Sequence, residues 1–456
     1  MNEPVVILGG GCTGPLLGLL LARRGQRVDL YERRADARRV ALPAGRSINL
    51  ALAARGLAAL ERAGLVEAVR PLLLPMRGRM VHDLGGEARF LPYGQRPHEL
   101  LYAVARADLN RVLVDAAEAA GVRFHFEHAC RDADFARGQV EIEDLAAGLR
   151  FELPLGPLLA ADGSGSALRH AMVAAGLARA REETLAHRYK ELTIPAGRDG
   201  RHALALGALH IWPRGGYMLI ALPNVGGTFT ATLFLPAEGE PVSFASLASP
   251  AAARALFERD FADVLALLPD FEAQYAANPV GRMSTIYAAP WHSGGRALLI
   301  GDAAHAIVPF HGQGMNCAFE DCRVLDDLLG SAPDWPTRFA RFDALRREDT
   351  AAIARMAIEN YTEMRDTVRD PAFALQKQLS LELERRNPER FIPRYSMVMF
   401  HSEIPYAEAE RRGAIQAELL AAATRGCTRL GEVDLPRLEA AVAERLAPIS
   451  APVAAA

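Results

Sequence analysis

Apolar and polar positions alternate in two different ways along the chain, and the first way extends over residues 1–180. Short apolar runs that end at glycine or aspartate predict buried parallel strands, and amphipathic stretches between them predict helices. The predicted strands cover residues 4–8, 27–31 and 156–161, and the predicted helices cover residues 14–24, 52–63 and 106–120. Strand, helix and strand in this order favour an α/β fold with a parallel sheet and right-handed crossovers.

The pattern changes near residue 185, where strand-like segments follow one another with glycine pairs as turns. These segments cover residues 189–195, 209–212, 217–222 and 228–236 and predict an inserted antiparallel sheet. The α/β pattern returns at 296–300 with a helix from about residue 314, and amphipathic helices follow from residue 335. We therefore predict an α/β domain over residues 1–180 and 291–330, a β-rich domain over 181–290 and a helical region over 331–456. Strands near residues 75–105 are further candidates for the inserted sheet.

Composition excludes several classes of protein. Lys plus Arg is 52 and Asp plus Glu is 55, so no basic excess indicates nucleic-acid binding. The five cysteines are scattered and form no CxxC pair, which argues against a disulfide scaffold or a zinc ribbon and favours a reducing compartment. The first residues do not resemble a signal peptide, and the apolar segment 15–22 is far shorter than the roughly 20 residues of a membrane span. We expect a cytoplasmic protein without a membrane span.

A glycine-rich motif follows the first predicted strand and opens the first predicted helix. Residues 9–14 (GGGCTG) fit G-x-G-x-x-G in the setting that this motif requires. The glycines permit a tight turn, and the N–H groups of the helix N-terminus can bind a pyrophosphate. Glu32 ends the second strand, 18 residues after Gly14, where a carboxylate can accept hydrogen bonds from ribose hydroxyls. Together these features indicate a dinucleotide site; the alternative is a glycine turn beside a surface glutamate.

Two further segments decide which dinucleotide is bound. Residues 161–166 (ADGSGS), with Arg169, and residues 301–316 (GDAAHAIVPFHGQGMN) each follow a predicted strand. Asp302 can hold ribityl or ribose hydroxyls, and N–H groups at residues 314–316 can face an electron-rich ring edge. Taken singly, an Asp-Gly or Gly-Asp pair is more often only a turn.

The three motifs together resemble the FAD-dependent aromatic hydroxylases that use one Rossmann domain. The resemblance implies non-covalent FAD in the α/β domain, a substrate domain built on the inserted sheet, and NADPH as a transient reductant. It implies that Pro309 shapes the wall beside the flavin. The implied cofactor-binding residues are Gly9, Gly11, Gly14, Glu32, Ala51, Arg106, Asp302, Gly314, Met315 and Asn316.

Within this class the chain resembles the kynurenine 3-monooxygenase family in its soluble, bacterial form. The segments that carry the resemblance are residues 45–52, 75–80, 209–224, 228–236, 301–316, 360–365 (NYTEMR) and 391–400 (FIPRYSMVMF). The resemblance implies hydroxylation of L-kynurenine to 3-hydroxy-L-kynurenine with NADPH and O2, through a flavin C4a-hydroperoxide. The charged helices and alanine tail at the end of the chain differ from the hydrophobic anchor of mitochondrial members.

Kynurenine carries a carboxylate, an amine, a ketone and an aniline ring, and a carboxylate in a half-apolar pocket calls for a bidentate arginine. The family match assigns Arg79 to that carboxylate and Tyr395 to an added hydroxyl, and with Pro309 these residues form the expected catalytic site. The expected substrate-binding residues are Arg79, Tyr93, Asn360, Glu363, Met364 and Tyr395.

Each of these residues has a structural alternative. Arg77 shares a strand face with Arg79, so either arginine could be the exposed one. Asn360 and Glu363 lie three positions apart on a predicted helix and could form a solvated face, and the tyrosines could belong to a turn or to the core.

Two other functions compete with this interpretation. One is a related hydroxylase for a ring-substituted kynurenine or another aminoaryl acid, which the same pocket motifs would serve. The other is a non-oxygenating FAD sensor, which would not need a clamp for an amino-acid carboxylate. No metal is expected, because His305 and His311 lie six positions apart without an accompanying acid pair. The choice between NADPH and NADH, the oligomeric state and the role of residues 405–456 stay open.

Overall fold

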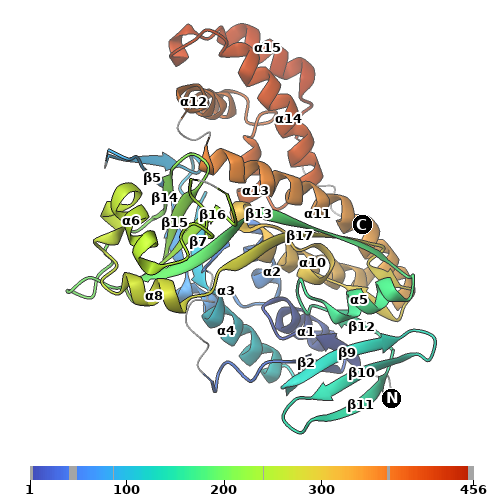
Figure 1. The fold of residues 1–456 in the computed structure, drawn as a ribbon. Coiled ribbons are helices and arrows are strands. Elements are labelled where there is room, and N and C mark those ends of the chain that lie inside the picture. The colour runs from blue at the N-terminus through green and yellow to red at the C-terminus, as the bar shows by residue number, and fades with distance from the viewer. Residues whose placement is uncertain (1–3, 41–48, 86, 240, 367–369, 450–456) are drawn as a thin grey trace. The chain divides into compact units, whose positions relative to one another are not determined.

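The computed structural model describes residues 4–40, 49–85, 87–239, 241–366 and 370–449, so part of the 45–52 segment lies outside the described residues. The chain folds into two compact units and passes from one to the other several times (Figure 1). Unit 1 consists of Met1–Leu73, Val104–Leu185 and Arg282–Ala354, and unit 2 consists of Leu74–Ala103, Ala186–Gly281 and Arg355–Ala456. The expected boundary at 180/181 falls inside strand β13, which extends over Arg179–Ile194.

Unit 1 contains a six-stranded sheet with the order β18-β19-β12-β1-β2-β8. The strands β1, β2, β8, β12 and β19 pair in parallel, whereas β18 pairs with β19 in antiparallel fashion. Their bounds are β1 Val5–Leu8, β2 Val28–Glu32, β8 Arg123–Phe126, β12 Leu158–Ala160, β18 His292–Ser293 and β19 Ala297–Leu299. The strand order reverses beside β1, which is where such sheets bind ligands at their carboxyl ends.

The helices of unit 1 are α1 Thr13–Arg23, α2 Ala54–Arg62, α3 Val66–Val69, α4 Arg106–Ala119, α5 Ala167–Ala174, α9 Asp302–His305 and α10 Gly314–Ser331, with short 3-10 turns at Arg70–Leu72 and Pro309–His311. Of these, α1, α5 and α9 follow the carboxyl ends of β1, β12 and β19. Helix α1 packs against α4 and α10. Its leucines, including Leu16, Leu17 and Leu21, are fully buried. They form the apolar pattern from which the sequence predicted this helix.

Several short strands lie outside the elements predicted for unit 1. A three-stranded antiparallel sheet, β9 His128–Asp134, β10 Gln139–Asp144 and β11 Leu149–Pro154, lies in unit 1. Strand β11 is largely exposed and carries Arg150 and Glu152 between apolar residues, so its sequence is difficult to distinguish from that of a loop.

The strands β4 Leu74–Met76 and β7 Leu101–Ala105 lie in the region near residues 75–105 that was a candidate for the inserted sheet. They form a separate three-stranded sheet with β3 Asn49–Leu52 instead.

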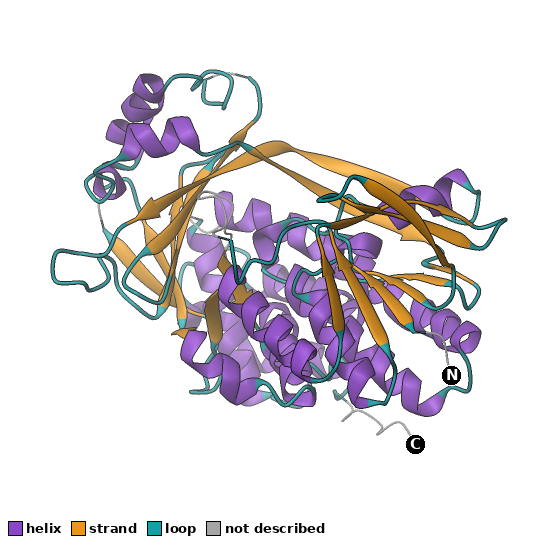
Figure 2. Cartoon of the chain, turned by 90° about the horizontal axis from the view of Figure 1, so that it is seen from below, coloured by secondary structure: helices purple, strands orange, loops and turns teal. Residues whose placement is uncertain are grey.

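Unit 2 contains the predicted antiparallel sheet, extended by two strands from earlier in the chain. Its strands are β13 Arg179–Ile194, β16 Phe229–Pro236, β15 Met218–Pro223, β14 Ala208–Pro213, β5 Gly78–His82 and β6 Ala88–Pro92, in that spatial order. Only the β14–β5 pair is parallel within this set. The chain returns to unit 1 through β17 Gly281–Ala289. Figure 2 distinguishes the strands and helices of the chain by colour.

Three helices, α6 Pro250–Asp260, α7 Ala262–Leu265 and α8 Phe271–Ala277, lie within the segment that the sequence predicted as β-rich. Their buried aromatic residues Phe257, Phe261 and Phe271 form one core with Trp212 and Phe229 of the sheet. The helices therefore cover one face of the sheet and supply the apolar layer that it requires.

The C-terminal helical region predicted from the sequence is confirmed. It comprises α11 Trp335–Arg365, α12 Pro371–Arg386, α13 Arg394–Phe400, α14 Tyr406–Ala423, a 3-10 turn at Leu430–Glu432 and α15 Leu435–Arg445. Leu379, Leu383, Phe391, Leu419 and Leu438 are buried in a separate small core between these helices. Among the described residues, no helix combines the length and the apolar character that crossing a membrane would require.

A neutral histidine pair lies within unit 2. His82 Nε2 lies 2.8 Å from His210 Nδ1, and His210 Nε2 lies 2.9 Å from the carbonyl oxygen of Ala205. Burial, together with the adjacent His210, lowers the pKa of His82 to about 4, and burial also lowers the pKa of His210. The Trp212 ring stacks on His82 at a centroid distance of 4.2 Å. Because His210 Nε2 donates to a carbonyl, its Nδ1 accepts from His82 Nε2, and a proton added to His82 would sit on Nδ1 and place a charge in a largely buried site.

This pair predicts a loss of stability in mild acid. Because the folded pKa of His82 lies below the value of about 6.5 in an unfolded chain, its contribution is complete above pH 6.5 and is lost as the pH falls toward 4. The loss at pH 5 relative to pH 7.5 is about 2 kcal/mol for His82 alone. Urea unfolding of the wild type and of His82→Gln at both pH values measures it. His98→Gln, at an exposed histidine, is the control; an equal pH dependence in all three proteins would contradict the prediction.

Candidate active site

The glycine loop of unit 1 lies at the carboxyl end of β1 and leads into α1. A Cβ atom on Gly14 would overlap the carbonyl oxygen of Gly9, so glycine lets the helix begin directly against the loop. Above Gly11 the space is open, since a Cβ there would meet only Arg106 Nη2, at 4.0 Å. The loop thus presents its backbone toward free space, as a pyrophosphate site requires.

Two adjoining cavities of about 290 and 210 Å³ extend from this loop. Both are lined by Gly11, Arg106, Ala161, Gly163 and Asp302, so they form one elongated groove. The larger cavity also contains the predicted residues Gly9 and Glu32, and the smaller one contains the predicted residues Ala51, Pro309, Gly314 and Met315. The structure therefore brings together most of the residues that the sequence assigned to the cofactor.

Glu32 lies at the end of β2 and is held by the glycine loop. Its Oε2 accepts a hydrogen bond of 2.6 Å from the Gly10 N–H, and its Oε1 accepts bonds of 2.9 and 2.8 Å from the backbone N–H and Nε of Arg34. Burial opposes the charge of Glu32, but these bonds lower the pKa of its carboxyl below the usual value. The carboxylate is thus ionised and fixed in the groove, and a hydroxyl donor would replace the 3.4 Å bond that Arg34 Nη2 donates to Oε2.

Three other groups fit a bound dinucleotide. Asp302 and Arg106 are both exposed, and both line the two cavities of the groove. The Arg106 guanidinium lies above Gly11. Asp162 accepts a 2.9 Å bond from the Ala167 N–H through Oδ2, whereas its buried Oδ1 has no hydrogen-bond partner in the described chain. Hydroxyl donors and a pyrophosphate would satisfy these groups.

Two predicted cofactor residues do not line the groove. Gly14 has the packing role described above. Asn316 is fully buried: its Oδ1 accepts a 2.8 Å bond from the Ala53 N–H, and its Nδ2 donates 2.8 Å bonds to the carbonyl oxygens of Ala51 and Gly312. The Asn316 side chain therefore positions the two backbone segments that do line the smaller cavity.

A second constellation lies in unit 2 around Arg79. This arginine projects from β5 and is 7% exposed, whereas Arg77 is exposed, which settles the alternative between the two residues. Arg79 Nη1 donates to Glu363 Oε1 at 3.2 Å and Nη2 donates to Asn360 Oδ1 at 3.5 Å. The buried Nε has no hydrogen-bond partner in the described chain. Burial opposes the charge, but Tyr395 and Glu363 raise the pKa of the guanidinium, which stays a cation.

Two tyrosines cover the guanidinium. The rings of Tyr93 and Tyr395 stack with centroids 5.5 Å apart, and Arg79 Cζ lies 5.0 Å from the Tyr395 ring and 5.9 Å from the Tyr93 ring. Burial raises the pKa of both phenols, so each stays a neutral hydrogen-bond donor. Tyr93 follows β6, and Tyr395 belongs to α13. The predicted tyrosines are therefore neighbours of Arg79, as the site interpretation requires.

Helix α11 supplies the remaining predicted residues. Asn360 and Met364 are buried, and Asn360 Nδ2 lies 3.3 Å from Met364 Sδ. Glu363 is partly exposed, with 26% of its side-chain surface accessible. The alternative of a solvated face for Asn360 and Glu363 is wrong for Asn360, whose side chain is buried, and Glu363 is only partly exposed.

Sequence reasoning missed Lys377 on α12. Its Nζ lies 5.4 Å from the centre of the Tyr395 ring. Burial, followed by repulsion from Arg79, lowers the pKa of this ammonium to about 8, while Glu363 partly offsets the shift. One signal was available in the sequence: the chain contains only two lysines, Lys190 and Lys377, although Lys plus Arg is 52.

Comparison with known proteins identifies the family of the chain. Residues 2–333 match the family model described as FAD binding domain. The chain is 49% identical over 448 residues to a kynurenine 3-monooxygenase of Xanthomonas axonopodis pv. citri (strain 306), with 98% of each chain covered. It is also 49% identical over 445 residues to a kynurenine 3-monooxygenase of Stenotrophomonas maltophilia (strain K279a), covering 98% of this chain and 97% of the relative.

Solved structures share the fold at lower identity. One is 2-methyl-3-hydroxypyridine-5-carboxylic acid oxygenase, with a TM-score of 0.64 and 19% identity over 82% of this chain and 96% of that one. Another is p-nitrophenol 4-monooxygenase PnpA from Pseudomonas putida DLL-E4, with a TM-score of 0.63 and 20% identity over 84% and 94% of the two chains. The family match identifies FAD as the dinucleotide of the groove. The chain therefore belongs to the FAD-binding domain family and, within it, to the kynurenine 3-monooxygenase family.

Proposed function

We propose that this protein hydroxylates L-kynurenine to 3-hydroxy-L-kynurenine, with NADPH and O2 as co-substrates and NADP⁺ and water as the other products. The observation that carries the proposal is the buried, incompletely paired guanidinium of Arg79 beneath two neutral tyrosines. The unused Nε donor of this cation calls for a further acceptor, and a small carboxylate, with two oxygens in one plane, can supply it. The names of the relatives support kynurenine as the source of that carboxylate.

The charges around Arg79 suit a zwitterionic amino acid. Its carboxylate would accept hydrogen bonds from Arg79 and the phenol groups, and Lys377 would add a second cation nearby. Its ammonium would pair with Glu363 and with the Asn360 amide oxygen. Met364 offers a soft apolar surface for the aromatic ring. An acid that lacks the amino group would lose these contacts with Glu363 and Asn360, and the site therefore discriminates in favour of an α-amino acid.

FAD, once reduced by the nicotinamide nucleotide, supplies the activation of O2 from which one oxygen atom is transferred to the ring. The side chains of this protein bind and orient the reactants. Glu32, Asp302 and the glycine loop would hold the dinucleotide, and Pro309 would shape the wall of the smaller cavity. Arg79 would fix the substrate by its carboxylate. No side-chain base is required at the reacting carbon, because the aniline nitrogen of kynurenine already donates electron density to the position beside it.

The first test is NADPH oxidation by the purified holoenzyme with and without L-kynurenine, combined with mass analysis of the product. Strong stimulation and a product heavier by one oxygen atom would support the proposal. Stimulation that yields only hydrogen peroxide would show that kynurenine binds without being the substrate. An absence of stimulation would contradict the proposal and favour another aminoaryl acid or a sensor role.

Replacement of Arg79 should weaken substrate binding specifically. Loss of a buried, hydrogen-bonded charge costs about 2–5 kcal/mol, so Arg79→Ala should raise the KM for L-kynurenine by roughly 30-fold or more. The FAD content should not change, since all residues of the groove belong to unit 1. Steady-state kinetics and the flavin absorbance of the purified variant measure both quantities. Arg77→Ala, at the exposed arginine two positions earlier, is the matched control, and an equal KM in the two variants would exclude Arg79 from the site.

The lowered pKa of Lys377 predicts that the affinity for kynurenine depends on pH. A carboxylate stabilises the ammonium, so binding should weaken as the pH rises through about 8 and Lys377 of the free enzyme loses its proton. The wild-type KM should rise between pH 7 and pH 9. Lys377→Met should show a higher KM at pH 7 and a flatter profile, and Lys377→Arg, which cannot deprotonate, should be flat with a low KM.

The scarcity of lysine permits a direct check of this assignment. An amine-reactive reagent should modify Lys377 with an apparent pKa near 8, and L-kynurenine should protect it. Lys190 is buried and bonded to the carbonyl oxygen of Tyr275 at 2.8 Å, so it is the internal reference. Unprotected labelling of Lys377, or identical pH profiles of all three proteins, would remove Lys377 from the substrate site.

A further inference from the structure

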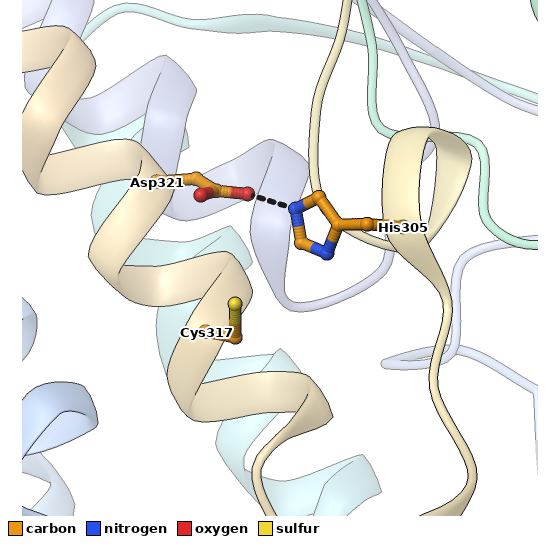
Figure 3. Close-up of side chains that lie close together, drawn as sticks. All are labelled: His305, Cys317 and Asp321. Carbon is orange, nitrogen blue, oxygen red and sulfur yellow. Dashed lines mark hydrogen bonds and ion pairs between the residues drawn. The ribbon is translucent and has the colours of Figure 1, made fainter. Parts of the chain in front are cut away.

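Three potential metal ligands, His305, Cys317 and Asp321, lie together in the interior of unit 1 (Figure 3). Their ligand atoms lie within 4.8 Å of one another, and all three residues are buried. The guanidinium of Arg346 already occupies this place: its Nε donates to Asp321 Oδ1 at 2.8 Å and its Nη2 lies 3.4 Å from Cys317 Sγ. A metal cation would have to displace a buried organic cation. The cluster therefore requires another explanation.

The Asp321 carboxylate accepts hydrogen bonds from both ends of the turn that contains Asp302. Its Oδ2 accepts a 3.1 Å bond from the Gly301 N–H and a 2.6 Å bond from His305 Nε2, which Figure 3 shows. An ionised carboxylate can only accept, so His305 must carry its proton on Nε2. Residues 301 and 305 bracket the short helix α9, Asp302–His305. One fully buried carboxylate thus fixes the helical turn that begins with Asp302.

The backbone at the start of this turn is directed by the Asp321 carboxylate. Gly301 has φ of +60° and ψ of −141°, a region that glycine adopts freely and residues with a Cβ rarely adopt. The N–H of Gly301 points inward to Asp321, while the next residue, Asp302, is exposed in the groove. Without the Asp321 carboxylate this buried N–H would lose its acceptor, and the flexible glycine could turn to find another one. The direction of Asp302 therefore depends on Asp321.

We propose that Asp321 is a positioning residue for FAD: through its bonds to Gly301 and His305 it aims the Asp302 carboxylate at the hydroxyl groups of the cofactor. Arg346 completes the arrangement, because it neutralises Asp321 and also reaches Glu320 Oε2 at 2.7 Å. This inference rests on the proposed cofactor role of Asp302. It does not depend on which substrate the enzyme hydroxylates.

The test compares FAD affinity across a double-mutant cycle of Asp302→Ala and Asp321→Asn. The Asp321→Asn change retains the size of the side chain but places an N–H₂ group against donors from Gly301, His305 or Arg346. FAD released on dilution of the holoenzyme, separated by ultrafiltration and measured by its visible absorbance, gives the Kd. We expect Asp321→Asn to raise the Kd roughly tenfold or more, the cost of one hydrogen bond to a charged group.

The cycle separates positioning from general support of the fold. If Asp321 acts through Asp302, the double variant should have a Kd within about twofold of Asp302→Ala alone. Effects that multiply would overturn the proposal. So would a Kd of Asp321→Asn equal to that of the wild type. If Asp302→Ala alone left the Kd unchanged, the role of Asp302 and this inference would both fail, whereas kynurenine-stimulated NADPH oxidation by the wild type would still decide the proposed reaction.

Asp326→Asn is the matched control on the same helix. Asp326 is also buried and ion-paired, with Arg24 Nε at 2.5 Å and Arg62 Nε at 2.7 Å, but it does not bond to α9. We expect this variant to lower the thermal unfolding temperature while leaving the Kd of FAD within about twofold of the wild type. An equal weakening of FAD binding in Asp326→Asn and Asp321→Asn would assign Asp321 a merely structural role.

Discussion

A buried guanidinium must be neutralised by the groups around it, and the surroundings of Arg79 in unit 2 follow from this requirement. Glu363 provides one negative charge at 3.2 Å, and two tyrosine rings cover the guanidinium. In such a buried environment each electrostatic interaction is strengthened, since the effective dielectric constant is low. Arg79 and the nearby Lys377 carry two positive charges against the one negative charge of Glu363, and a substrate carboxylate would balance the difference.

Buried charges in unit 1 must be neutralised as well, and here the side chains of the protein neutralise one another. The carboxylates of Glu320 and Asp321 are both paired with Arg346, and Glu320 is also bonded to Arg55 at 2.5 Å. These ions need no ligand, and they hold helices and backbone segments in place. Around Arg79, by contrast, the two cations Arg79 and Lys377 lie beside the carboxylate of Glu363. The balance of buried charge therefore differs between the two places.

The sequence was most informative where function depends on local geometry. The glycine loop, Glu32 and Asp302 each follow a strand directly, and the parallel sheet brings their strand ends to one groove, so the cofactor site could be predicted without knowledge of long-range contacts. The Asn316 side chain was assigned to the cofactor as well, although it bonds to backbone groups on two other segments. Its neighbours in the fold, Ala51 and Ala53, lie far from it in the chain.

The Arg79 site could not be derived in that way. Its members come from β5, from the residue after β6, and from α11, α12 and α13, and no periodicity relates residue 79 to residues 360, 377 and 395. Only the family resemblance joined Arg79, Tyr93 and Tyr395 before the structure did. The short strands β9–β11 and the helices α6–α8 escaped prediction for a similar reason, because packing against distant segments decides their state.

Position 377 is lysine and not arginine, and this difference supports the assignment of the residue to the substrate site. A guanidinium keeps its proton at any physiological pH, so two arginines side by side would repel each other permanently whenever no anion was bound. A buried ammonium can release its proton, and the repulsion from Arg79 is one of the causes that lower the pKa of Lys377 to about 8. The pocket can therefore relax toward a single cation when empty and regain the second one when a carboxylate arrives. In a chain whose basic residues are otherwise almost all arginine, this difference in chemistry gives a reason for lysine at this position.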